Sequence, residues 1–163
     1  MTEKNNINPY RELEETIHAV LADEILKSAL DFVGYLKAND LVVNGIEISH
    51  NEKAVCYMHL DDKKDYPSPW TIWTEGDYSS EHEDIPMDNC MKEVAWANIN
   101  ICGDCGAGCS PGKRKIIFGR AFDDVCNADM AFYMPDAETL ECVKKLLEMR
   151  VNNIVKEGML IAK

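Results

Sequence analysis

The chain has 163 residues, of which 46% are hydrophobic and 28% are charged, and this balance predicts a single domain with its own core. Its formal net charge of −12 repels phosphate backbones and anionic lipid surfaces, so we expect no nucleic-acid or membrane partner. No apolar run approaches the roughly 20 residues that span a bilayer, and the N-terminus lacks a signal-peptide pattern, which favours the cytoplasm.

The N-terminal part of the chain is expected to be helical. Residues 1–7 are polar, and we expect them to be disordered. Asn8 and Pro9 then form a cap followed by a proline at the first helical position. Apolar residues recur at helical spacing over 9–38. This segment is either one long helix or two, with a break near Ala22 and Asp23.

Extended segments are expected to follow these helices. Two short pieces, 41–43 and 46–48, lie beside turn signals. Residues 53–60 alternate as a strand, and residues 70–75 form a second strand that pairs with it as a hairpin.

A helix opened by Pro86 is expected to run to about residue 98 or 100. The pattern then predicts strands at 116–118 and 128–134, with 122–126 as a connecting piece. The last helix begins at Pro135 and Asp136, where the aspartate caps it.

The predicted order is therefore two helices followed by two strand-strand-helix units within 53–163. Two hairpins, each followed by a helix, can build one antiparallel sheet with helices on a single face. The sequence thus predicts an α+β fold in which a cysteine loop at 102–112 lies between the two units.

The cysteine loop holds three thiols, Cys102, Cys105 and Cys109, among four glycines, and Cys126 follows in the next segment. Thiolates on a tight glycine-rich turn can converge on one ion, so these four residues are the predicted ligands of a zinc ion. Cys90 is a substitute for the fourth ligand. An iron–sulfur cluster is the alternative cofactor, although the spacing does not match the ferredoxin pattern.

Two further interpretations of these thiols remain open. Cys102 and Cys105 form a Cys-x-x-Cys pair, which is a redox-active dithiol in suitable folds. The pair follows the C-terminus of a predicted helix, where the dipole does not favour a thiolate. The simplest interpretation is that the cysteines of the loop are small side chains that hold no ion.

Four aromatic residues, Tyr57, Trp70, Trp73 and Trp96, are candidates for the lining of a small-molecule pocket. On the predicted strand 70–75, Trp70 and Trp73 face opposite ways, so neither face of the strand is simply solvent. A core position for one of them is the alternative. The acidic net charge favours a cationic ligand.

The segments around the cysteines resemble those of uncharacterised proteins of anaerobic bacteria. The resemblance rests on Trp96–Gly112, Ile117–Arg120, Val125–Cys126 and Met134–Asp136, and it implies that the cysteines belong together. Separately, the paired strand-strand-helix outline is similar to that of GyrI-like effector-binding domains. That resemblance implies binding of small, often cationic or aromatic, molecules between two halves.

The sequence therefore predicts a small-molecule-binding module with a metal-stabilised cysteine loop rather than an enzyme. A thiol redox protein or an iron–sulfur protein that uses Cys102 and Cys105 is the competing class. An interaction protein that forms a homodimer is the third.

Overall fold

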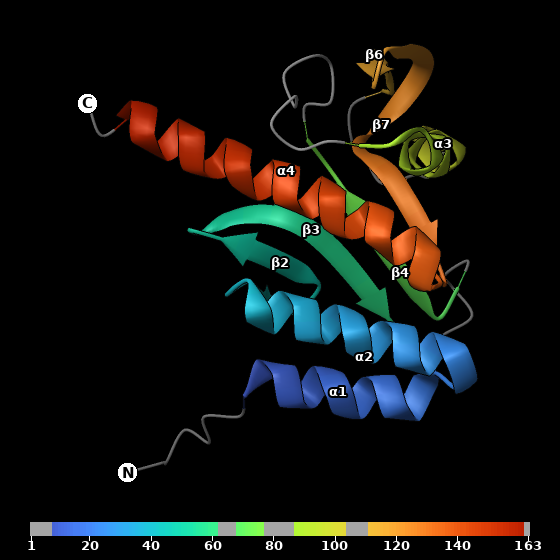
Figure 1. Ribbon diagram of the computed structural model, residues 1–163, viewed down its shortest axis with the longest axis vertical. Helices are drawn as coiled ribbons and strands as arrows, with labels where there is room; N and C mark the ends of the chain where they lie inside the picture. The colour runs from blue at the N-terminus through green and yellow to red at the C-terminus, as the bar shows by residue number, and fades with distance from the viewer. Residues whose placement is uncertain (1–7, 62–67, 77–86, 104–110, 162–163) are drawn as a thin grey trace.

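The computed structural model describes residues 8–61, 68–76, 87–103 and 111–161. Within these residues the chain forms four helices and seven strands, an α+β architecture, as the sequence predicts (Figure 1). In chain order the elements are α1 (Pro9–Val20), α2 (Asp23–Ala38), β1 (Val42–Asn44), β2 (Glu47–His50), β3 (Lys53–Leu60), β4 (Trp70–Thr74), α3 (Asn89–Ala97), β5 (Ile99–Ile101), β6 (Lys113–Ile117), β7 (Arg120–Tyr133) and α4 (Ala137–Ile161).

The two leading helices are separate because the chain turns between them. Asn8 caps α1 by accepting a hydrogen bond from the backbone of Tyr10 at 3.1 Å, and Pro9 occupies the first turn. The chain is extended at Ala22, and Asp23 has a φ of +54°. The predicted break at these two residues is confirmed.

The strands form one antiparallel sheet in the order β1-β2-β3-β4-β7-β5, and β6 also pairs with β7. On β7, Met130 pairs with both β4 and β5, whereas Val125 pairs with both β5 and β6. Strand β5 therefore lies along one edge of β7, and β4 and β6 share the other edge.

The helices cover one face of the sheet (Figure 1). Helix α4 contacts β3 and β4, α2 contacts α4, and α1 and α3 pack against α2 and α4, respectively. The rings of Phe32 on α2 and Trp70 on β4 lie 6.5 Å apart. The core between helices and sheet includes fully buried Leu36, Ile72 and Leu147. Such burial supplies most of the folding free energy of a domain of this size.

The second half of the chain differs from the prediction in two places. The helix before the cysteine loop ends at Ala97 with Asn98 as its cap, close to the predicted end at 98, but residues 99–101 form strand β5, which the sequence does not predict. Residues 122–126 are not a connecting piece, because β7 runs unbroken from Arg120 to Tyr133. The first half of β7 has a strand partner in β6, with an irregular register near Asp124, whose φ is +55°.

The last helix starts where the sequence predicts. The Asp136 carboxylate accepts a hydrogen bond from the backbone N–H of Thr139 at 2.8 Å, which caps α4. Both strand-strand-helix units are present, as β3-β4-α3 and β6-β7-α4, and β5 is inserted between them.

Candidate functional site

The two described ends of the cysteine loop meet on strand β7. The backbone N–H of Cys102, which directly follows β5, donates to the carbonyl oxygen of Asp124 at 2.6 Å. Gly112 directly precedes β6, and a Cβ atom added there would lie 2.5 Å from the same oxygen and 2.7 Å from the Cβ of Cys102. The loop therefore begins and ends at one place, and this close approach of backbones requires glycine at position 112.

Two of the four predicted metal ligands belong to the described part of the chain. Cys102 and Cys126 are free and half-buried, and Cys126 comes two residues after Asp124, which accepts the hydrogen bond from Cys102. Both backbones therefore reach the same stretch of β7. Cys105 and Cys109 lie outside the described residues. Within the described ranges, no three His, Cys, Asp or Glu side chains gather closely enough to hold a metal ion.

A partly buried ion pair lies next to this place. Asp129 on β7 is 1% exposed, and its carboxylate pairs with the ammonium group of Lys115 on β6. The same ammonium group donates to the carbonyl oxygen of Cys126 at 3.2 Å, and the backbone N–H of Gly76 donates to Asp129 at 3.0 Å. Lys115 and Asp129 thus join β6 and the end of β4 to the middle of β7.

Sequence reasoning missed this pair. Asp129 belongs to the predicted strand 128–134, where its neighbours are apolar, and a lone carboxylate in such a strand is a signal for a buried charge. The partner could not be identified from the sequence, because Lys115 lies in a run of three basic residues.

Two of the four predicted aromatic residues lie side by side on the face of the sheet opposite the helices. A single register row crosses four strands, from Glu47 on β2 through Tyr57 on β3 and Trp73 on β4 to Ala131 on β7. Because side chains directly opposite each other in an antiparallel sheet lie on one face, this row forms a continuous strip. The ring of His59 lies 6.4 Å from that of Trp73 on the same face.

The hydroxyl of the half-buried residue Tyr57 lies in a negative environment. Its pKa is raised above the ordinary value, first by burial and then by the nearby carboxylates of Glu75 and Glu47. A hydrogen bond to the Glu75 side chain raises the pKa further, whereas the charge of Arg150 lowers it. The phenol therefore stays neutral at physiological pH, beside two carboxylates.

The other two predicted aromatic residues lie elsewhere. Trp70 is fully buried on the helix side of β4, so it contributes to the core and has no accessible surface. Trp96, near the end of α3, donates from its indole nitrogen to the carbonyl oxygen of Ile117 at 2.8 Å. The guanidinium of Arg120 lies over its ring at 3.9 Å from the centroid. The structure thus brings Tyr57 and Trp73 together and separates both from Trp70 and Trp96.

The remaining described thiols have different environments. Cys56 and Cys142 are buried, and burial raises the pKa of both, to about 12 for Cys142. Cys90 lies in the first turn of α3 and is exposed. Two of these three cysteines are thus inert components of the core.

Comparisons of the chain with protein-family models, curated proteins and solved structures give no match. Across the residues that the structure describes, none of the helices, α4 included, combines the length and apolar character needed to cross a bilayer.

Proposed function

We propose that the protein binds a small organic cation on the sheet face opposite the helices. The observation that carries this proposal is the pairing of Tyr57 and Trp73 between the carboxylates of Glu47 and Glu75. Faces of electron-rich rings attract an ammonium group, and each such contact contributes about 0.5–2 kcal/mol. Two carboxylates beside the rings add charge complementarity, and the net charge of −12 steers cations toward the protein.

The similarity in outline to GyrI-like effector-binding domains is consistent with this class of ligand, and that relationship stays a prediction. The pocket predicted from the sequence contained all four aromatic residues. The site proposed here keeps Tyr57 and Trp73 and adds Glu47 and Glu75. A cytoplasmic location likewise stays a prediction from the sequence.

A titration with benzyltrimethylammonium, followed by isothermal titration calorimetry, tests the proposal. We expect saturable binding that a Trp73→Leu variant abolishes and that a Glu75→Gln variant weakens about fivefold. Trp96→Phe is the matched control, because Trp96 contacts Arg120 and Ile117 instead, and it should bind normally. Equal affinity for benzyl alcohol, or unchanged binding in Trp73→Leu, would show that the rings do not select a cation.

We further propose that the cysteine loop holds a structural zinc ion through Cys102, Cys105, Cys109 and Cys126. The support is the closure of the loop at Cys102 and Gly112, beside the segment of β7 that carries Cys126. Cys105 follows Cys102 by three residues, and Cys109 precedes Gly112 by three. Covalent geometry limits the distance spanned by three residues to about 10 Å, so Cys105 and Cys109 stay near the closed ends of the loop. Four thiolates can therefore meet at one ion.

Elemental analysis of protein purified without oxygen tests this second part. One zinc per chain is expected, together with its loss in both Cys109→Ser and Cys126→Ser variants. Iron together with sulfide would favour the iron–sulfur cluster over the zinc ion. Metal-free protein whose Cys102 and Cys105 oxidise reversibly to a disulfide would favour the redox alternative. Neither of these results would affect the calorimetric titration, so the two parts of the proposal can fail independently.

A further inference from the structure

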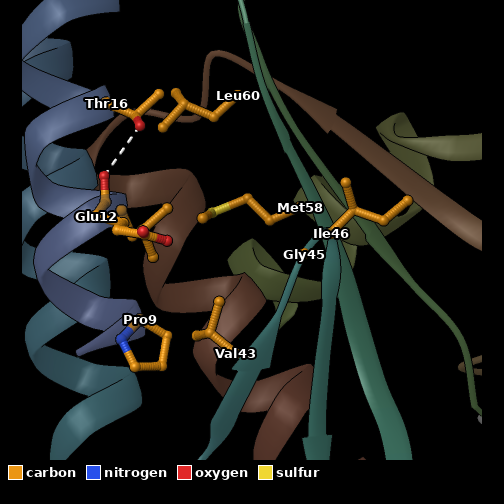
Figure 2. Close-up of a pocket in the computed structure, with 9 residues that line it drawn as sticks. Pro9, Glu12, Thr16, Val43, Gly45, Ile46, Met58 and Leu60 are labelled. Atoms are coloured by element: carbon orange, nitrogen blue, oxygen red, sulfur yellow. Dashed lines mark hydrogen bonds between the residues drawn. The ribbon is translucent and has the colours of Figure 1, made fainter. Parts of the chain in front are cut away.

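A groove of about 220 Å³ lies on the helix side of the sheet, between α1 and strands β1 and β3, with the turn at Gly45 and Ile46 completing its lining (Figure 2). Leu13 of α1 and Met58 and Leu60 of β3 form part of its apolar lining, and Glu12 and Thr16 of α1 are its two polar side chains. Figure 2 shows Glu12 and Met58 extending from opposite sides toward the same space. The groove is distinct from the Tyr57–Trp73 strip, which lies on the other face of the sheet.

The polar side chains of the groove offer only hydrogen-bond acceptors. The hydroxyl of Thr16 donates its proton to the backbone carbonyl of Glu12 at 2.9 Å, which leaves its oxygen lone pairs as acceptors. The Glu12 carboxylate has only acceptors and carries a negative charge. A ligand that fits these groups has to bring donors and a positive charge.

The Glu12 carboxylate is also available to a ligand. The other two acids in the middle of α1 are paired, Glu14 with Lys37 and Glu15 with Arg11. No lysine or arginine of the described residues forms an ion pair with Glu12. This charge therefore lies at the edge of an apolar groove without a counter-charge from the described chain.

We propose that this groove is a second binding site, and that its ligand is a small apolar primary amine in its ammonium form. Its volume is below the roughly 300–1,000 Å³ of sites that hold drug-sized molecules, so the apolar body is limited to one ring or a short alkyl chain. The body packs against Leu13, Met58 and Leu60, and the ammonium group donates to Glu12 and Thr16. Burial of the apolar body provides the affinity, and the two acceptors provide the selectivity for an amine.

The test is a titration of the full chain, carrying ¹³C-methyl methionine, with 2-phenylethylammonium chloride at pH 7. We expect the methyl resonance of Met58, assigned from a Met58→Leu variant, to shift saturably. A Glu12→Gln variant should bind about fivefold more weakly, and neutral 2-phenylethanol should bind the parent chain with a similar loss. Glu24→Gln removes an equal charge from an exposed ion pair on α2 and should leave the titration unchanged.

Three results would overturn the proposal. One is an unmoved Met58 resonance at saturating amine, and another is a shift that Glu12→Gln does not weaken. The third is loss of the Met58 titration in Trp73→Leu, which would mean that the amine binds at the aromatic strip and affects the groove only indirectly. Because the groove and the strip lie on opposite faces of the sheet, a negative result for one binding site does not contradict the other.

Discussion

Replacement of Gly112 by alanine should push apart the two ends of the cysteine loop, which meet at Asp124. The new Cβ would lie 2.5 Å from the carbonyl oxygen of Asp124 and 2.6 Å from its carbon, and both are backbone atoms that no side-chain rotation can move. Relief of this overlap costs about 1–3 kcal/mol, and displacement of Asp124 weakens its hydrogen bond with Cys102, which contributes about 1 kcal/mol. The free energy of unfolding should therefore fall by about 3 kcal/mol.

Urea unfolding followed by circular dichroism measures this loss, which corresponds to a decrease in Tm of roughly 6–12 °C for a chain of this length. Gly103→Ala is the matched control, because apart from its chain neighbours no described residue has an atom within 4 Å of the Cβ it would add at the other end of the loop. We expect this variant to remain within about 0.5 kcal/mol of the parent. If the two variants lose equal stability, the loop does not close at Gly112 as described.

Three other changes are predicted. Lys115→Met leaves the buried carboxylate of Asp129 without its lysine partner, whose side chain is 29% exposed. The free energy of unfolding in urea should fall by about 2–3 kcal/mol, and a loss below about 1 kcal/mol would contradict a stabilising role. The backbone hydrogen bond at the start of α4 lowers the pKa of Asp136, so its stabilisation is present above its ordinary pKa and is lost as the pH falls through the lowered value. Asp136→Ala should therefore cost about 1 kcal/mol at pH 7 but little at the lowest accessible pH, whereas Asp136→Asn should keep the cap at both. Burial raises the pKa of Cys142 to about 12, so pulsed alkylation of metal-free native protein at pH 8, followed by mass spectrometry, should label Cys102 well before Cys142.

The sequence predicts those helices and strands that bury one face, because their apolar residues then recur at the period of a helix or a strand. Residues 53–60 alternate because β3 has the helices on one side and the aromatic strip on the other. The first half of β7 shows no such alternation, since most of its residues are at least partly exposed and Asp123 and Asp124 are adjacent acids that resemble a turn. Its strand conformation depends on pairing with β5 and β6, and no local pattern encodes that pairing.

The candidate site was predictable in its residue types but not in its assembly. The alternation of a strand correctly placed Trp70 and Trp73 on opposite faces. Which of these faces the helices cover depends on how α2 and α4 pack, so the core position of Trp70 could not be assigned. Trp96 has its ring against Arg120, a contact between α3 and β7 that has no sequence signature.

The position of β7 in the sheet also affects how the chain is made. Strand β4 ends at Thr74, but its second neighbour in the sheet is the part of β7 from Met130 to Tyr133. During synthesis on the ribosome, the edge of β4 that pairs with β7 therefore stays unpaired until most of the chain has emerged. An incomplete nascent chain exposes that edge to other chains, so we expect premature termination before residue 130 to produce aggregates rather than a smaller folded protein.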